Sequence, residues 1–194
     1  MSYPTTLSAY QPLLAKIDEL LRTEPRVLLA IDGDAAAGKS TLAELLRQAY
    51  DCNVFAMDHF FLRPEQRTQA RLDEPGGNVD YVRFQAEILT PLGTGQPFTY
   101  RPWDCKTGDF GTEIPVTPNP LNIIEGAYSQ HPMFGDVHHI KVFLTVPPEE
   151  QLRRIGLRNG ETQLERFQTE WIPMEKRYFA AFGIQAQCEF VFGQ

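Results

Sequence analysis

The sequence predicts an α/β fold with a mainly parallel five-stranded sheet flanked by helices, one long insertion and a helical lid. Short apolar runs, typical of buried strands, alternate with stretches whose apolar residues recur at helical spacing. Such alternation is typical of parallel sheets covered by helices. In addition, a glycine-bounded loop joins the first run to a helix. The expected strands are residues 27–31, 53–57, 121–126, 139–146 and 188–192.

Length and composition favour one ordinary globular domain. The 194 residues suit a single domain over 1–194, and the chain is 42% hydrophobic and 22% charged. A formal net charge of −7 argues against a large non-specific nucleic-acid surface. Cys52, Cys105 and Cys188 are widely spaced and are expected to be reduced thiols. Because no signal pattern or membrane-length apolar run is present, we expect a cytoplasmic protein without nucleic-acid or membrane partners; homo-oligomerisation is left open.

The first expected element is an amphipathic helix over residues 8–21, which Pro25 ends. Its apolar side chains share one helical stripe: Leu13, Leu14, Ile17, Leu20 and Leu21. We expect this helix to serve as scaffold outside the core of the fold.

A loop of the form G-x-x-x-x-G-K-[ST] follows the first strand. Gly33 and Gly38 permit backbone angles and close approaches that a Cβ would hinder, so successive amides can cradle phosphates. Lys39 then reaches the β- and γ-phosphates of a nucleotide, and the Ser40 hydroxyl ligates Mg²⁺. The expected nucleotide-binding residues are Gly33, Asp34, Ala35, Ala36, Ala37, Gly38, Lys39, Ser40 and Thr41.

The surroundings of this loop predict a P-loop NTPase fold, because a strand precedes it and strong helix formers follow over 41–47. A tight strand-to-helix turn that binds no nucleotide is the alternative. P-loops often carry glycine and serine where this one carries Ala35, Ala36 and Ala37. We therefore expect a stiffer loop.

Acidic residues stand at the ends of two other expected strands. Asp58 follows the second strand, where an acid can meet a substrate hydroxyl that faces the γ-phosphate; capping a helix or turn is the alternative. Glu125 ends the strand over 121–126, as in a Walker B arrangement that delivers a carboxylate to the water shell of Mg²⁺. An acid that merely ends a strand is the alternative for Glu125.

Residues 59–120 are expected to form an insertion on the substrate side. A polar loop or short helix over 63–77 leads to a helix over 79–89, which Pro91 and Gly93 are expected to stop. Many prolines and glycines follow, and residues 98–100 and 113–116 could form a short hairpin. This segment is too irregular for the core sheet.

A helix that Pro148 opens carries Arg153, Arg154 and Arg158. These arginines fit a lid, about residues 153–170, that clamps phosphates by bidentate contacts, or else a solvated helix face. A second helical stretch over 162–181 is expected to break or kink at Pro173.

The order of these motifs resembles the uridine kinase branch of P-loop kinases, which also includes relatives of phosphoribulokinase and pantothenate kinase. The resemblance covers nearly the whole chain after the first helix. It rests on segments 31–41, 57–61, 77–80 and 123–126, and on the lid arginines Arg153, Arg154 and Arg158.

The resemblance implies a role for individual residues. Asp58 would be the general base, Ser40 and Glu125 would hold Mg²⁺, and Arg154 and Arg158 would stabilise phosphoryl charge. On the acceptor side, Asp80 would bind sugar hydroxyls and Tyr100 would contact the substrate.

Trp103 adds a second flat face beside Tyr100 on which a heterocycle could stack, or it packs the insertion on the core. Three departures from the family pattern stand out. Cys105 replaces a base-reading histidine, His59 follows the expected base, and the spacing from Arg154 to Arg158 is one residue longer.

The sequence therefore predicts ATP- and Mg²⁺-dependent phosphoryl transfer to a small-molecule hydroxyl, first of all that of a nucleoside. A kinase for another alcohol, such as a sugar phosphate or a pantothenate-like metabolite, is the alternative that Arg101, Lys106 and the missing histidine support. A P-loop switch that acts on a protein partner is the third hypothesis, although an N-K-x-D guanine motif is missing. ATP or GTP preference, oligomeric state, the division of work between the lid arginines and the role of His59 are left open.

Overall fold

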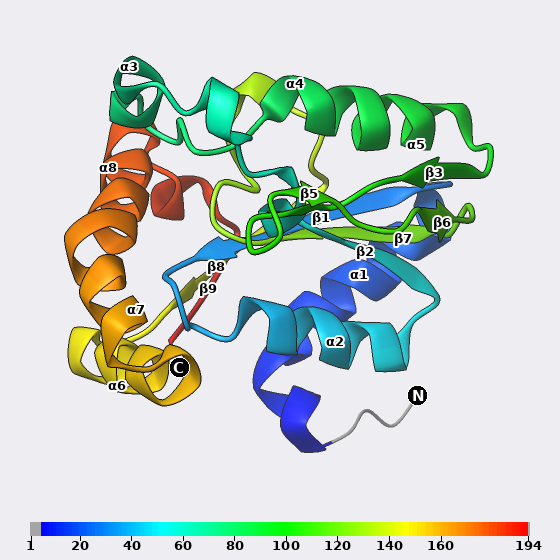
Figure 1. Cartoon of the computed structure of the whole chain (residues 1–194). Coiled ribbons are helices and arrows are strands. Elements are labelled where there is room, and N and C mark those ends of the chain that lie inside the picture. Colours follow the sequence, from blue (N-terminus) through cyan, green and yellow to red (C-terminus); the bar gives the residue numbers. More distant parts are fainter. Residues whose placement is uncertain (1–4, 194) are drawn as a thin grey trace.

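The apolar runs form one central sheet in the computed structural model, which describes residues 5–193 (Figure 1). The strand order is β2–β7–β1–β8–β9, and every neighbouring pair is parallel. These strands are β1 (Val27–Gly33), β2 (Cys52–Ala56), β7 (Leu121–Glu125), β8 (Ile140–Thr145) and β9 (Phe190–Gly193). The predicted five-stranded parallel sheet is confirmed.

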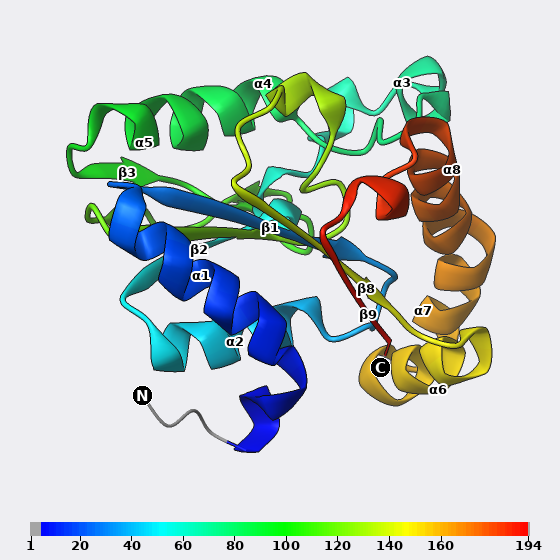
Figure 2. The same ribbon diagram turned by 180° about the vertical axis from the view of Figure 1, so that it is seen from behind.

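Burial on both faces explains why the central strands are continuous apolar runs. Every residue of β1 is buried. One face packs against α1 (Gln11–Thr23) and α2 (Lys39–Ala49), and the other packs against the helical segment 81–94 and α8 (Ile172–Phe182) (Figures 1 and 2). The fold thus has helical layers on both sides of the sheet.

The first helix begins later than predicted, because a 3₁₀ turn (η1, Thr5–Tyr10) precedes α1. Pro12 lies in the first turn of α1, where a missing backbone amide costs no helical hydrogen bond. The predicted apolar stripe does face the core, since Leu13, Leu14 and Ile17 are fully buried.

The prediction that Pro91 and Gly93 stop a helix was wrong. The helix continues through α4 (Tyr81–Phe84), a π-helical turn (η4, Gln85–Leu89) and α5 (Thr90–Thr94), and Gly95 ends it with φ of +68°. The π-helical turn ends at Leu89, immediately before Thr90-Pro91, and its wider hydrogen-bond spacing accommodates the missing amide and the crowding ring of Pro91. The helix predicted to break or kink at Pro173 shows the same arrangement: a π-helical turn over Phe167–Trp171 precedes the proline, and the helix continues into α8.

The insertion is built from short elements. After two turns, η2 (Met57–Phe60) and η3 (Pro64–Gln66), comes α3 (Gln69–Asp73). The predicted hairpin is present as β3 (Phe98–Tyr100) paired antiparallel with β6 (Ile114–Val116). A smaller hairpin of β4 (Trp103–Asp104) and β5 (Asp109–Phe110), which was not predicted, extends its tip.

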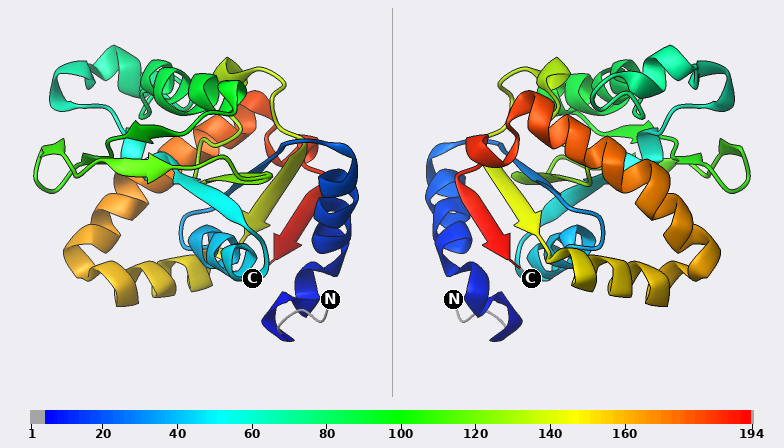
Figure 3. Two further views of the ribbon diagram at one scale, coloured as in Figure 1. Left: turned by 90° about the vertical axis from the view of Figure 1, so that its right-hand side faces the viewer. Right: turned by 90° about the vertical axis from the view of Figure 1, so that its left-hand side faces the viewer.

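The helical segment 148–182, which contains the expected lid and which we call the lid region, forms an arc around one side of the sheet (Figure 3). It runs through α6 (Pro148–Asn159), α7 (Glu161–Arg166) and a π-helical turn (η6, Phe167–Trp171) into α8. The remaining elements are two 3₁₀ turns, η5 (Pro132–Phe134) and η7 (Gln185–Gln187). None of the helices in the described part of the chain combines the length and apolar character needed to span a bilayer.

Candidate active site

Strand register gathers the candidate residues at one edge of the sheet. Glu125, the last residue of β7, pairs in register with Ile31 of β1 and Ala56 of β2. The P-loop follows β1, and Asp58 follows β2 within η2. The loop, Asp58 and Glu125 therefore share the carboxyl edge, where α/β proteins bind ligands.

The P-loop needs glycine at both ends for different reasons. Gly33 has φ of +134°, and a Cβ there would collide with the Leu144 carbonyl oxygen of β8. The Asp34 amide donates to that same carbonyl at 2.9 Å, so the loop leaves the sheet tightly against β8. Gly38 has φ of +93°, and no described atom lies within 4 Å of where its Cβ would be. The loop is therefore open above Gly38.

The backbone amides of the loop divide into two groups. Those of Asp34, Ala35 and Ala37 donate to the Leu144 carbonyl, the Glu175 carboxylate and the Asp34 carbonyl. Five further amides have no hydrogen-bond partner among the described residues: Ala36, Gly38, Lys39, Ser40 and Thr41. Three of these belong to the first turn of α2, where the helix dipole favours an anion. This amide set fits the phosphates of a nucleotide.

Lys39 lies over the same loop. Its ammonium group donates to the carbonyl oxygens of Gly33 at 2.7 Å and Asp34 at 2.8 Å. An ammonium group has three hydrogens, so one is left for a further acceptor.

Ser40, Glu125 and Asp58 come together in front of the loop. The Ser40 hydroxyl lies 3.1 and 3.2 Å from the two carboxylate oxygens of Glu125. Desolvation raises the pKa of Glu125, and the negative charge of Asp58 raises it further. Mg²⁺ is usually held by one or two protein oxygens together with phosphate and water, so Ser40 and Glu125 fit that ion.

Asp58 is exposed to solvent, yet the surrounding protein raises its pKa by desolvation. The positive charges of Lys39, His59 and Arg158 act in the opposite direction and favour the carboxylate. A carboxylate that desolvation makes somewhat more basic suits the acceptance of a proton.

The three lid arginines differ in what they contact. Arg153 is exposed and pairs with Glu150 at 2.6 Å. Arg154 pairs with the same carboxylate at 2.7 Å and donates to the Ala36 carbonyl of the P-loop at 3.2 Å. The guanidinium of Arg158 donates to its neighbour Asn159 and lies close enough to lower the pKa of Asp58.

The aromatic residues of the insertion are mostly buried. Tyr100 stacks on Phe60 with 5.7 Å between ring centroids, and its hydroxyl lies 3.2 Å from Nδ1 of His59. Trp103 is 8% exposed and packs edge-on against Phe110. Neither the Tyr100 ring nor the Trp103 ring therefore offers a freely exposed face on which a heterocycle could stack.

Cys105 lies in the turn between β4 and β5, within electrostatic reach of the candidate site. Burial raises the pKa of this thiol most; Arg67 lowers it and the negative charge of Asp58 raises it, so both groups lie within electrostatic reach. Arg101 holds the hairpin together by donating to the carbonyls of Gly111 and Phe110.

Asp80 is the N-cap of α4. Its Oδ1 accepts the Arg83 amide at 3.0 Å, and its Oδ2 accepts a hydrogen bond from the Gln66 side chain at 2.7 Å. The carboxylate is 9% exposed. Both carboxylate oxygens of Asp80 thus already accept hydrogen bonds, and the sequence did not indicate these partners. A role of Asp80 in sugar binding stays a prediction.

We expect Asp80→Ala to lower stability by about 1 kcal/mol, because a helix cap is lost. If Asp80 also binds sugar hydroxyls, the acceptor KM rises sharply while the KM for ATP barely moves. Thermal unfolding and steady-state kinetics measure the two effects. Asp80→Asn, which keeps the cap, is the matched control. An unchanged acceptor KM in Asp80→Ala would limit Asp80 to the cap.

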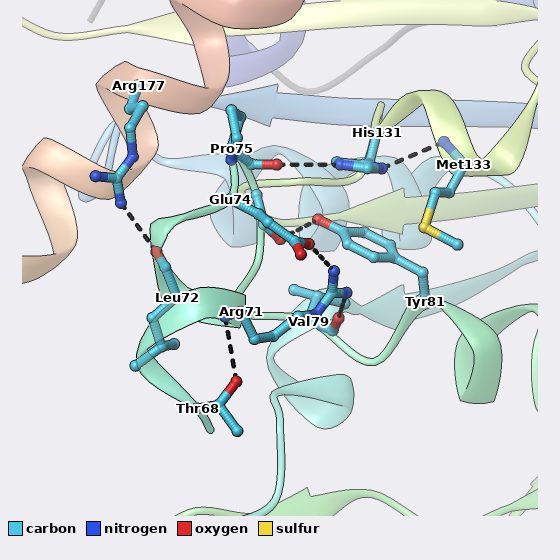
Figure 4. A network of polar contacts seen from close by, with 11 residues as sticks. Thr68, Arg71, Leu72, Glu74, Pro75, Val79, Tyr81, His131, Met133 and Arg177 are labelled. Carbon is cyan, nitrogen blue, oxygen red and sulfur yellow. Dashed lines mark hydrogen bonds and ion pairs between the residues drawn. The ribbon is translucent and has the colours of Figure 1, made fainter. Parts of the chain in front are cut away.

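Polar contacts fix the segment between α3 and α4 (Figure 4). Arg71 forms an ion pair with Glu74 and donates to the Val79 carbonyl. The Tyr81 hydroxyl donates to the Gly76 carbonyl at 2.6 Å. These contacts hold the segment between α3 and α4 in one conformation, although it pairs with no described strand of the central sheet.

Sequence reasoning missed two buried carboxylates beneath the P-loop. Asp32 of β1 accepts hydrogen bonds from the Gly33 amide, the Gln130 amide and the Tyr178 hydroxyl at 2.8, 3.2 and 2.9 Å. Burial raises its pKa to about 6. An acid that follows an apolar run and precedes the first loop glycine was the available signal for Asp32.

Glu175 of α8 is the second missed carboxylate. It accepts the Ala35 amide at 3.0 Å and is 9% exposed. Burial raises its pKa to about 7, while the charge of Lys39 acts in the opposite direction. No local pattern marked this glutamate, because its partner lies 140 positions earlier in the chain.

Glu175→Gln is expected to raise the melting temperature by several degrees at about pH 8, and far less at about pH 5. Burial raises the Glu175 pKa from 4.5 to about 7 in the folded protein, so folding favours the protonated carboxyl. That contribution is complete below pH 4.5 and is lost as the pH rises through 7. A neutral amide avoids this loss of folding free energy, which is on the order of 3 kcal/mol. Thermal unfolding across this pH range measures the effect, and a pH-independent difference would contradict it.

The parallel sheet and the glycine-bounded loop together define a P-loop NTPase fold, and the comparisons with solved structures agree. No protein-family model and no curated protein matches the sequence. The structure of a possible uridine kinase from Bacillus stearothermophilus has a TM-score of 0.65 at 19% identity, over 93% of this chain and 99% of that one. The structure of D-glycerate 3-kinase from Cryptococcus neoformans var. grubii has a TM-score of 0.61 at 13% identity, over 86% of this chain and 87% of that one. The structure of the YGR205w protein has a TM-score of 0.57 at 14% identity, over 97% of this chain and 92% of that one.

These likenesses run along nearly the full length of each chain. They confirm the fold expected from the resemblance to the uridine kinase branch. At such identities they establish the fold alone.

Proposed function

We propose that this protein is a small-molecule kinase that transfers the γ-phosphoryl group of ATP to a hydroxyl group, with a nucleoside as the first candidate acceptor. The observation that carries the proposal is the P-loop with five unpartnered amides, placed at one sheet edge with Lys39, Asp58 and Glu125. Two proteins of similar fold are described as a possible uridine kinase and a D-glycerate 3-kinase, and both names imply hydroxyl acceptors.

The loop amides and Lys39 would hold and neutralise the phosphates. Mg²⁺, held by Ser40 and Glu125, would supply additional positive charge when bound. Asp58 would accept the proton of the acceptor hydroxyl. Little covalent work is left for the protein, so positioning and charge stabilisation would supply most of the rate.

The contacts of the lid arginines suggest a division of work. Arg154 is occupied by Glu150 and by the loop carbonyl of Ala36, which suits a role in holding the loop. Arg158 pairs with no carboxylate among the described residues and lies near Asp58, which suits stabilisation of the transferred charge.

An acidic alcohol, such as a sugar phosphate, is the second candidate acceptor. Arg67 and Asp58 both lie within electrostatic reach of the Cys105 thiol, and the Arg67 guanidinium donates to the Asn78 side chain at 3.1 Å. An acceptor with its own negative charge could pair with that cation while its hydroxyl faces Asp58.

A panel of nucleosides, sugars, sugar phosphates and hydroxy acids with ATP–Mg²⁺, read by product mass, tests the proposal. A phosphorylated nucleoside supports the first candidate, and a product from acidic alcohols only supports the second. ATP hydrolysis that is independent of every small alcohol would contradict both and favour a P-loop switch acting on a protein partner. The same panel with GTP establishes the nucleotide preference.

A further inference from the structure

Ala35 of the P-loop is held from two sides by the helices of the lid region. Its amide donates to the Glu175 carboxylate of α8, and its carbonyl accepts a hydrogen bond from the Gln151 side chain of α6, each at 3.0 Å. Gln151 is 4% exposed and Glu175 is buried as well. Both polar contacts are thus shielded from water, where losing one partner costs more than at the surface.

The methyl group of Ala35 is also part of this contact. It belongs to a small apolar cluster with Ile155 of α6 and Ile172 of α8, and Leu164 and Phe167 pack against the cluster from the outside. Two hydrogen bonds and one methyl group therefore join a single P-loop residue to α6 and to α8, the helices on either side of α7 and η6.

Ala36, the next residue, has φ of +59°. This left-handed conformation costs a residue with a Cβ roughly 1–2 kcal/mol. Strain of this kind persists only where the surroundings hold it, and here Arg154 holds the Ala36 carbonyl. Two of the three alanines that distinguish this P-loop, Ala35 and Ala36, thus lie where the lid region contacts the loop.

We propose that Ala35, Glu175 and Gln151 form a pivot that fixes the bases of α6 and α8 to the P-loop and so positions the lid arginines over bound phosphate. This inference rests on the proposed function and deepens it. Glu175 and Gln151 are positioning residues, because they contact the loop and not the phosphate-facing amides.

Charged and polar groups from several elements surround the Glu175 carboxylate. Lys39 of α2 faces it with positive charge, while Asp32 of β1, Asp34 of the loop and Tyr128 after β7 lie near it. The Ala35 amide requires a hydrogen-bond acceptor at this position, and that acceptor does not need a full negative charge. Glutamine offers that same oxygen.

Glu175→Ala, Gln151→Ala and Glu175→Gln test the pivot, with Lys176→Ala, an exposed position on the same helix, as control. Hydrogen exchange is followed by mass spectrometry without nucleotide. We expect faster exchange in the P-loop and across residues 161–171 for both alanine variants, and exchange near that of the wild type for Glu175→Gln and Lys176→Ala. Exchange that rises only within α8, or equally in Lys176→Ala, would overturn the pivot.

Kinetics provide a readout that a purely structural role would not produce. Misplaced lid arginines should lower kcat about tenfold to a hundredfold in the alanine variants, with a smaller change in the KM for ATP, and Glu175→Gln should restore most of kcat. A Glu175→Gln variant as slow as Glu175→Ala would contradict the inference. Should Glu175→Ala fail to fold, Gln151→Ala decides.

The exchange measurement separates this inference from the proposed function. It needs neither nucleotide nor acceptor, so the comparison of variants decides the pivot by itself. Absence of ATP binding in the wild type would contradict the proposed kinase function, and unchanged lid exchange in both alanine variants would contradict the pivot.

Discussion

Lys39→Ala is expected to lose phosphoryl transfer almost completely, with a drop in rate of at least about 10²–10³-fold. Its ammonium group lies over the P-loop, where it would neutralise phosphate charge, and it donates hydrogen bonds to the carbonyl oxygens of Gly33 and Asp34. The fold should survive, because both contacts lie within one loop and no core side chain is removed. Product formation at saturating ATP measures the rate, and thermal unfolding measures the fold.

The control for this variant is Lys16→Ala. Lys16 lies on α1 and forms a surface ion pair with Glu19, so its loss should leave transfer unchanged. Wild-type turnover in Lys39→Ala would remove the kinase hypothesis. A collapsed melting curve would instead show that Lys39 holds the loop together.

Asp58→Asn should keep its affinity for ATP and lose about 10²–10⁴-fold in kcat. The amide is nearly isosteric with the carboxylate, but it does not accept a proton near neutral pH. In the wild type, kcat/KM should fall as the pH drops through the raised pKa of Asp58, because the base must be ionised to act. The variant should lack that acidic limb.

Steady-state rates and a pH profile of both proteins measure these effects, and Asp51→Asn is the control. Asp51 is exposed just before β2, on the opposite end of that strand. A fall of less than about tenfold in Asp58→Asn, below the usual range for a general base, would show that Asp58 orients or caps and that the base lies elsewhere.

Local patterns in the sequence predicted much of the site. Gly33 and Gly38 are required by the backbone of one short loop, and apolar runs of strand length place Asp58 and Glu125 at strand ends. Parallel strands end on one side, so an acid after each of two strands predicts that both acids meet the loop. The register of β7 with β1 and β2 confirmed that placement.

Other features depended on contacts that a local pattern does not record. The apolar spacing before Pro91 resembles a helix that ends there, yet a π-helical turn carries the helix onward. Asp80 stands beside a glycine turn and suits a ligand, yet the helix that follows and Gln66 take both of its oxygens. Three arginines within six positions look alike in sequence, and only their neighbours distinguish them.

The sequence by itself determined the strand–loop–helix unit, the two loop glycines and the acids at two strand ends, because these depend on backbone angles and on spacing along one element. The tertiary structure alone decided which loop amides stay free, which arginine holds the loop, and that Glu175 reaches Ala35. These outcomes require residues far apart in the chain to meet, 140 positions apart for Glu175 and Ala35. The packing of α6 and α8 on the loop, not any motif, brings such residues together.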